Sequence, residues 1–220
     1  MMTVRNRRKM AGIPRGVISR LPVYYRYLSG LSQAHEKISS AELGKALNMT
    51  AAQIRSDLSY FGSFGLHGYG YRVDELRQRI AEILGLDREY RLVLIGAGNL
   101  GRALASYQNF RRRGFVISAI FDSDPQIIGE ELGGVKIRSI DGLEKYLKSN
   151  PCDIAVICTP RDVSQGICDR LVAAGVKAIW NFSPIHLQVP DDVVVEHIHL
   201  TDSLLHLSFH LRHRTESNQS

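Results

Sequence analysis

The stretch RLVLIGAGNLG, residues 91–101, decides the fold of the larger part of this chain. Leu92 to Ile95 form an uninterrupted apolar run, which is typical of a strand buried on both faces of a parallel sheet. A GxGxxG pattern follows directly, at the point where such a strand turns into a helix. Its first glycine permits a tight turn, its second lets a pyrophosphate approach the backbone, and its third allows close packing of helix on strand. We therefore predict a dinucleotide-binding loop that consists of Gly96, Ala97, Gly98, Asn99, Leu100 and Gly101.

An acidic residue further along the chain supports this prediction. Asp122 ends the next apolar run, FVISAIFD, 21 residues beyond Gly101. A carboxylate at this place hydrogen-bonds an adenosine ribose hydroxyl and repels a 2′-phosphate, which favours NAD(H) over NADP(H). The alternative is a fold of this type that binds another nucleotide, such as a coenzyme A-type ligand, or none.

Further apolar runs extend the pattern outward from the glycine loop. They alternate with segments long enough for crossover helices, as in an α/β fold with a parallel sheet. We assign residues 87–198 to a Rossmann-type domain, and residues 199–220 to a C-terminal helix and tail with an unusually wide apolar face. The predicted strands are 91–96, 115–122, 135–140, 153–160, 177–183 and 193–198.

The charged residues are distributed unevenly along the chain. The 220 residues include 28 Lys/Arg and 22 Asp/Glu, for a net charge of +6. Residues 1–88 hold 14 Lys/Arg against 7 Asp/Glu, whereas residues 89–220 hold 14 against 15. This asymmetry predicts that the first part meets a polyanion, although a basic tail that only aids solubility would give the same count.

Several other classes of protein are disfavoured. No apolar stretch approaches the roughly 20 residues that a membrane helix needs, and the basic N-terminus leads into no apolar run. Cys152, Cys158 and Cys168 show neither a disulfide framework nor metal-ligand spacing. We expect a cytoplasmic protein with no membrane partner and no metal.

The first part of the chain has the pattern of a winged helix. Two capping boxes, Ser39–Glu42 and Thr50–Gln53, predict two short helices joined by a tight turn at Asn48–Met49. Such a pair is a helix-turn-helix. Glycines alternate with aromatic and apolar residues over 62–73, which predicts a β-hairpin, the wing.

Two more helices complete this prediction. The first spans 19–31, with Ser19 as its cap and Pro22 in its first turn, and the second begins at a capping Asp74 and ends at Gly85. We assign residues 1–17 to a basic arm and residues 18–86 to the winged-helix domain, with the boundary in 86–90.

The second helix of the helix-turn-helix carries residue types that read DNA. Gln53, Ile54, Arg55, Ser56 and Asp57 span the surface that such a helix presents to a major groove, and Thr50, which caps the helix, is assigned to the DNA site with them. Glutamine and arginine are residue types that bond base edges bidentately. The alternative is a helix-turn-helix that binds protein.

Four motifs together resemble the Rex family of redox-sensing repressors. They are QIRSDLSYFGSFGLHGYGY at 53–71, GAGNLG at 96–101, FDSDP at 121–125 and NFSP at 181–184, and the resemblance extends from Ile18 to Leu211. It implies a homodimer with exchanged C-terminal helices, bound to inverted-repeat operator DNA. It also implies that repression is relieved when NADH replaces NAD+.

The resemblance also implies roles for individual residues. Arg20, Gln53, Arg55 and the wing around His67 would contact DNA. Gly96 to Gly101 and Asp122 would bind the dinucleotide, with Thr159 and Pro160 near the nicotinamide. Arg26 and Tyr107 would couple the two halves.

The chain departs from the family pattern at three positions. Ser56 stands where the family has a basic residue, and His67 stands where the wing carries Arg or Lys. His199 replaces an aspartate that answers the arginine at the position of Arg26, and an imidazole gives that arginine no carboxylate partner.

Other functions stand beside this one. An NAD-dependent oxidoreductase with an accessory DNA-binding segment would have His186 as its best catalytic candidate, but the nucleotide fold leaves no room for a substrate domain. A nucleotide-sensing adaptor is a third possibility.

Cys158 could be a redox thiol, although a strand cysteine is more often inert. His206, His210 and His213 share a helix face, and with His197 or His199 they could hold a metal, although an interfacial polar face is the simpler interpretation.

Overall fold

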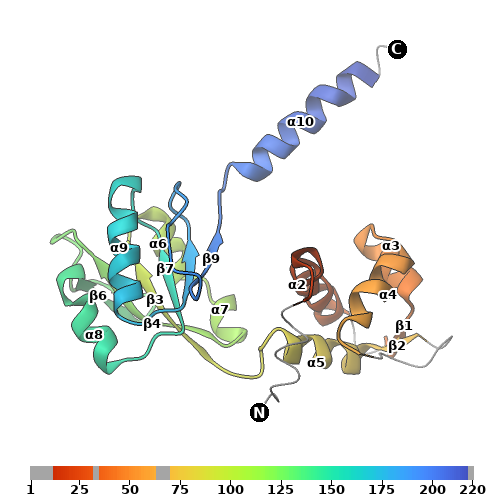
Figure 1. Cartoon of the computed structure of the whole chain (residues 1–220), viewed down its shortest axis with the longest axis horizontal. Coiled ribbons are helices and arrows are strands. Elements are labelled where there is room, and N and C mark those ends of the chain that lie inside the picture. Colours follow the sequence, from red (N-terminus) through yellow and green to blue (C-terminus); the bar gives the residue numbers. More distant parts are fainter. Residues whose placement is uncertain (1–11, 32–34, 63–69, 218–220) are drawn as a thin grey trace. The chain divides into compact units, whose positions relative to one another are not determined.

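The computed structural model describes residues 12–31, 35–62 and 70–217, with side chains up to residue 213. The chain divides into two compact units between Arg88 and Glu89, within the predicted boundary segment 86–90. Figure 1 shows the elements of both units.

The first unit is a small helical domain with a two-stranded sheet. Its elements are α2 (Arg15–Gly30), β1 (Lys37–Ile38), α3 (Ser40–Leu47), α4 (Ala51–Ser59), β2 (Tyr71–Arg72) and α5 (Val73–Ile83). The helices enclose one apolar core, to which α2 contributes Leu21, Tyr24 and Leu28. The strands β1 and β2 pair antiparallel. The predicted helix-turn-helix is confirmed as α3 and α4.

The capping residues account for where these two helices begin. Ser39 and Glu42 form the full reciprocal box at the start of α3. The Thr50 hydroxyl accepts the Gln53 amide at the start of α4, 3.1 Å away. The second box is only half formed, because the Gln53 side chain turns to Asp57 instead of to the Thr50 amide.

Two predicted helix starts in this unit were wrong. α2 begins at Arg15 after Pro14, so Pro22 lies inside it and Ser19 bonds the carbonyl of Gly16 as an interior residue. Pro22 is tolerated because it lies on the exposed side of the helix, where the carbonyl it leaves unbonded meets water. The predicted arm 1–17 therefore extends three residues into the helix. α5 begins at Val73, so Asp74 lies in its first turn and does not cap it.

The second unit is built on a seven-stranded sheet. Its order is β5-β6-β4-β3-β7-β8-β9, with every pair parallel except β5 and β6. All six predicted strands are present. The strands are β3 (Tyr90–Ile95), β4 (Phe115–Asp122), β5 (Glu131–Leu132), β6 (Val135–Ser139), β7 (Ile154–Ile157), β8 (Ala178–Asn181) and β9 (Val194–His197).

Apolar residues cover both faces of this sheet, as predicted. On one face Val93 and Ile95 of β3 pack with the helices α8 (Leu143–Ser149) and α9 (Arg161–Ala173), which lie together on the same side of the sheet (Figure 1). On the other face Leu92 and Leu94 pack with α6 (Asn99–Ala105). Strand residues alternate between faces, so consecutive apolar residues serve both cores.

Four further elements complete the unit. The antiparallel β5 was not predicted, and it joins β6 through Gly133 and Gly134, both with positive φ. A short helix α7 (Asn109–Arg112) precedes β4, and a 3₁₀ turn (Ile140–Gly142) precedes α8. Helix α10 (Asp202–Ser217) ends the described chain. Among the described residues, no helix is long and apolar enough to cross a membrane.

Candidate functional site

The glycine loop lies where the strand order of the sheet reverses. β3 has β4 on one side and β7 on the other, and this is the place where open α/β sheets bind ligands. Gly96 has a φ of +95°, and a Cβ there would stand 2.6 Å from the carbonyl oxygen of Cys158. The loop after β3 therefore touches the loop after β7, and a side chain at Gly96 would separate them.

The three glycines of the loop have different surroundings. A Cβ on Gly101 would overlap the carbonyl oxygen of Gly96, because α6 starts directly over the end of β3. A Cβ on Gly98 would have nothing within 4 Å. Gly98 thus borders open space at the start of α6, where the first backbone amides of the helix have no partner within it. This arrangement can receive a phosphate group.

Asp122 ends β4 beside this loop. Its Oδ2 accepts the amide of Ala97 at 2.5 Å, and its Oδ1 accepts the amide of Asp124 at 2.9 Å. The two bonds fix the carboxylate against the glycine loop. Each oxygen keeps a lone pair with which it can accept a ribose hydroxyl.

Thr159 and Pro160 follow β7 on the other side of the loop. The Thr159 hydroxyl lies 2.8 Å from the hydroxyl of Ser164, which in turn donates to Ser183 at 2.7 Å. Asn181 joins the same network, since its Oδ1 accepts the amide of Ser183 at 3.0 Å.

This polar network joins the segment after β7, which carries Thr159 and Pro160, to the segment after β8. Ser164, Asn181 and Ser183 are all buried, so their bonds fix the loops after β7 and β8 without contact with water. The sequence predicts no role for these polar residues. The motif NFSP contributes only to the family resemblance.

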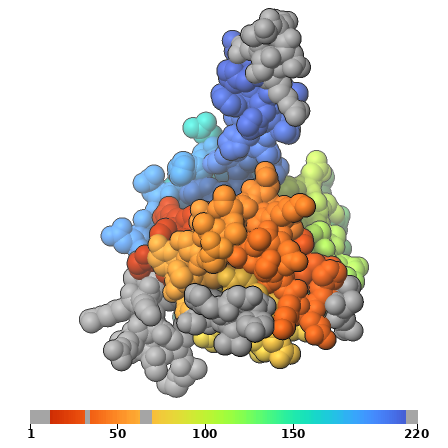
Figure 2. Space-filling view, turned by 90° about the vertical axis from the view of Figure 1, so that its right-hand side faces the viewer, coloured from red at the N-terminus to blue at the C-terminus, as the bar shows by residue number. Residues whose placement is uncertain are grey.

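Helix α4 presents a polar face. Ile54, Asp57 and Leu58 are its buried residues. Gln53, Arg55 and Ser56 are exposed, as is the capping Thr50. Arg55 donates to the hydroxyl of Ser40 on α3, 3.0 Å away. In Figure 2 α3 and α4, coloured orange, form one continuous surface toward the viewer.

Two residues that were predicted to contact DNA form hydrogen bonds with a buried side chain of the same unit. Arg20 and Gln53 both bond the carboxylate of Asp57, and the Tyr24 hydroxyl bonds it as well. The prediction that Ile54 and Asp57 belong to the DNA-facing surface of this helix is wrong, because both side chains are buried. The periodicity of α4 gives a signal for this burial, because positions 54, 57 and 58 share one helix face.

The predicted wing is described only in part. β2 pairs with β1, so the segment 62–73 does contribute a strand, but its described partner is Lys37–Ile38, which was not predicted. His67 lies outside the described residues.

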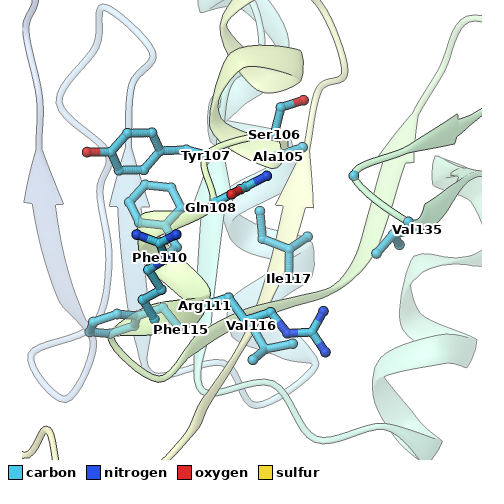
Figure 3. Close-up of a pocket in the computed structure, with 13 residues that line it drawn as sticks. Ala105, Ser106, Tyr107, Gln108, Phe110, Arg111, Phe115, Val116, Ile117 and Val135 are labelled. Carbon is cyan, nitrogen blue, oxygen red and sulfur yellow. The ribbon is translucent and has the colours of Figure 1, made fainter.

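The predicted coupling residues lie in different places. Arg26 is exposed on α2 in the first unit. Tyr107 follows α6 in the second unit and lines a pocket of about 870 Å³ with Phe110, Arg111 and Ile117 (Figure 3). This pocket lies at the amino end of β4, whereas Asp122 lies at the carboxyl end of the same strand. Tyr107 is thus at the edge of the sheet opposite the glycine loop.

His199 follows β9 in a cluster of three histidines. Its ring centroid lies 6.3 Å from that of His197 and 6.3 Å from that of His186, and the latter two lie 4.4 Å apart. The cluster includes His186, the catalytic candidate of the oxidoreductase alternative, but no acid partner accompanies it among its described contacts. Among the described residues, no three histidine, cysteine or acidic side chains are placed to hold a metal.

The cysteine after β7 has a thiol with a raised pKa. Cys158 follows β7, and burial raises the pKa of its thiol to about 12. A thiol with such a pKa stays protonated at neutral pH, and the thiolate is the reactive form. The raised pKa therefore disfavours Cys158 as a redox thiol.

Comparisons with known proteins agree with this arrangement. A family model described as "Putative DNA-binding protein N-terminus" matches residues 12–59, and one described as "CoA binding domain" matches residues 87–185. A redox-sensing transcriptional repressor Rex of Clostridium botulinum (strain Alaska E43 / Type E3) is 50% identical over 204 residues, which cover 92% of this chain and 97% of the relative. The corresponding repressor of Thermoanaerobacter pseudethanolicus is 48% identical over 92% of this chain and 91% of its own length.

Solved structures give the same answer. The crystal structure of RSP, a Rex-family repressor, matches with a TM-score of 0.88 and 44% identity, over 94% of this chain and 97% of that one. RSP has also been crystallised with NADH, and with NAD+ and operator DNA. These relatives are named as transcriptional repressors and not as enzymes. This chain belongs to the Rex family of redox-sensing transcriptional repressors.

Proposed function

We propose that this chain represses transcription as a homodimer on inverted-repeat operator DNA and leaves the operator when NADH replaces NAD+. The observation that carries the proposal is the pairing of two sites in one chain. A helix-turn-helix with an exposed polar face stands on a basic unit, and a glycine loop with an adjacent carboxylate stands at the switch point of a parallel sheet. The RSP structures with NAD+ and operator DNA, and with NADH, support both ligands.

Each site has its proposed residues. Thr50, Gln53, Arg55 and Ser56 face DNA from α4, and His67 and Arg20 assist. The dinucleotide is held by residues 96–101 and Asp122, with Thr159 and Pro160 at the nicotinamide. We place the action of the protein in the cytoplasm, where a bacterial operator is found.

The homodimer is proposed from the state of α10. Leu204, Leu207 and Leu211 recur along one side of this helix, and Leu205 and Phe209 widen the stripe. All five are between 58% and 68% exposed in the single chain. An exposed apolar stripe of this size marks a protein interface. A second copy of the chain is the occupant that a symmetric repressor supplies.

The test is fluorescence anisotropy at fixed salt. The probe is a labelled duplex that the wild-type protein itself selects from a random pool. Binding is measured without nucleotide, with NAD+ and with NADH. We expect tight binding that NAD+ preserves and NADH abolishes, on an inverted repeat with half-sites about 34–36 Å apart or a multiple of this. Equal binding in all three conditions would refute the redox response and leave the repressor.

The position of His199 tests the proposed coupling. If Arg26 requires a carboxylate partner, His199→Asp strengthens the difference between NAD+ and NADH, whereas His206→Asp, a matched change on α10, leaves it unchanged. Steady consumption of NADH in the presence of a carbonyl metabolite would instead favour the oxidoreductase. Absence of DNA binding at every salt concentration would favour the adaptor.

A further inference from the structure

Helix α4 carries a single acidic residue, and its side chain is completely buried. Asp57 has no exposed surface, although α4 is the helix proposed to face a polyanion. A buried carboxylate is costly unless its hydrogen bonds are complete. Its partners therefore show what it does.

Four hydrogen bonds saturate the Asp57 carboxylate. Oδ2 accepts Arg20 Nε at 2.5 Å and the Tyr24 hydroxyl at 2.5 Å. Oδ1 accepts Arg20 Nη2 at 2.8 Å and Gln53 Nε2 at 2.7 Å. Arg20 and Tyr24 belong to α2, whereas Gln53 lies one turn before Asp57 on α4. The network thus joins the two helices at one point.

This network orients α4 in a way that its apolar contacts do not. Ile54 and Leu58 hold α4 to the core, but apolar contacts are not directional. A bidentate arginine–carboxylate pair has a fixed plane and geometry. The pair therefore fixes the rotation of α4 about its axis, and with it the direction in which the exposed face points.

The network also uses two of the five N–H donors of Arg20 and turns that edge of the guanidinium toward Asp57. Nε and Nη2 both face Asp57, and the Arg20 side chain is only 28% exposed. Gln53 is held by one amide hydrogen and keeps its carbonyl oxygen for a base.

We propose that Asp57 is the positioning residue of the recognition helix, and that Arg20 supports operator binding through Asp57 and not through a phosphate contact of its own. This inference rests on the proposed function and deepens it.

The charge balance of the network agrees with this role. Burial opposes ionisation of Asp57, but the bonds from Arg20, Tyr24 and Gln53 outweigh it and hold the pKa of Asp57 below its usual value. The Asp57 bond likewise raises the pKa of Arg20. The pair is thus fully charged, and removal of Arg20 alone leaves a buried, uncompensated carboxylate.

The experiment is a double-mutant cycle on DNA affinity. It compares the wild type with Arg20→Gln, Asp57→Asn and the double variant, whose pair has the same net charge as the wild-type pair. Each protein is titrated on the selected operator duplex and on an unrelated duplex at several salt concentrations. We expect each single variant to lose about tenfold or more in operator affinity. The double variant should be no weaker than the weaker single variant.

Two readouts separate positioning from general destabilisation and from phosphate contact. A positioning role lowers the ratio of operator to unrelated affinity, which partial unfolding of the domain would not change. It also leaves the slope of log affinity against log salt unchanged in the double variant. Removal of a direct phosphate contact would instead reduce the magnitude of that slope by about 0.9.

Arg15→Gln is the matched control. It removes the same charge from an exposed position on α2 without touching Asp57, so its effect should add to that of Asp57→Asn. If Arg20→Gln does not fold, Tyr24→Phe removes one bond and keeps the buried ring. A smaller loss of affinity, again not additive with Asp57→Asn, is then expected.

The possible failures can be told apart. Operator binding by the wild type, with additive losses and a reduced salt slope for Arg20→Gln, would overturn the positioning role and leave the proposed function. Absence of binding by the wild type to any selected duplex would overturn the proposed function, and the positioning role with it.

Discussion

Gly98 and Gly101 lie one helical turn apart, but an added methyl group would act on them differently. At Gly101 it overlaps the carbonyl oxygen of Gly96, and at Gly98 it enters open space. Gly101→Ala should therefore lower the free energy of unfolding by about 1–3 kcal/mol, as overpacking does. Gly98→Ala should keep the melting temperature and weaken NADH binding by about tenfold or more, since the methyl group stands where the pyrophosphate approaches.

Thermal unfolding and NADH fluorescence titration check both expectations. Gly166→Ala is the control, because Gly166 lies within α9 with nothing near its Cβ position. That change should be neutral or slightly stabilising. Equal melting temperatures for the Gly98 and Gly101 variants would contradict the assignment of their roles.

His197 makes the second unit sensitive to acid. Burial, followed by the nearby His186 and His199, lowers its pKa below the usual 6.5, and Glu196 opposes this only in part. The ring also meets the side-chain amide of Asn181, 3.1 Å from Nδ1. The folded state therefore binds a proton on His197 less readily than the unfolded state does.

The sign of the pH dependence follows from this difference. Stability from neutral His197 is complete above the ordinary histidine pKa, and it is lost as the pH falls through that value toward the depressed one. We expect the melting temperature of His197→Asn to fall less than that of the wild type between about pH 7 and about pH 5. Parallel curves for the two proteins would refute the assignment.

At the residue scale, the sequence predicts chemical types better than partners. The residue types that make Gln53 and Arg55 suitable for bases are local properties, and the structure leaves both exposed on α4. The partner of Arg20 is 37 residues away, and only the fold brings it near. An acidic residue on a DNA-facing helix also resembles a solvent-exposed charge until its helical periodicity is considered.

At the scale of the element, capping residues predict where α3 and α4 begin, and apolar runs predict the strands. The box at Ser39 needs only two residues three positions apart, so it could be predicted. Pro22 misled the prediction of α2, because proline is common in the first turn but is also tolerated on an exposed face further along. The hairpin at Gly133–Gly134 has a signal in the sequence, two adjacent glycines between apolar residues.

The two helix caps give a prediction at this scale. Ser39 and Thr50 make equivalent bonds of 3.1 Å to the amides of Glu42 and Gln53. Ser39→Ala and Thr50→Ala should each lower the free energy of unfolding by about 1 kcal/mol. Only Thr50→Ala should weaken operator binding beyond this, since it caps the helix proposed to face DNA, and Thr50→Ser should restore both properties. Chemical denaturation and anisotropy measure the two effects. Equal loss of operator affinity in the two alanine variants would show that the Thr50 cap has no special role.

At the scale of the whole molecule, the two units differ in net charge. The first part of the chain holds the excess of basic residues, whereas the second part is close to neutral and holds the glycine loop. The apolar stripe of α10 is exposed in the single chain, which supports the proposed homodimer with its two recognition helices.

The last prediction tests this homodimer directly. Leu204→Glu combined with Leu207→Glu places two charges in the apolar stripe of α10, where both leucines are about 60% exposed in the single chain. We expect a monomer by analytical ultracentrifugation. Operator affinity should fall by about a hundredfold or more, because the two recognition helices are no longer linked in one molecule. NADH binding should weaken far less, since the residues of the glycine loop and Asp122 belong to one chain. His206→Glu, on the polar side of the same helix, should remain dimeric. A Leu204/Leu207 variant that stays dimeric and binds the operator normally would place the interface elsewhere.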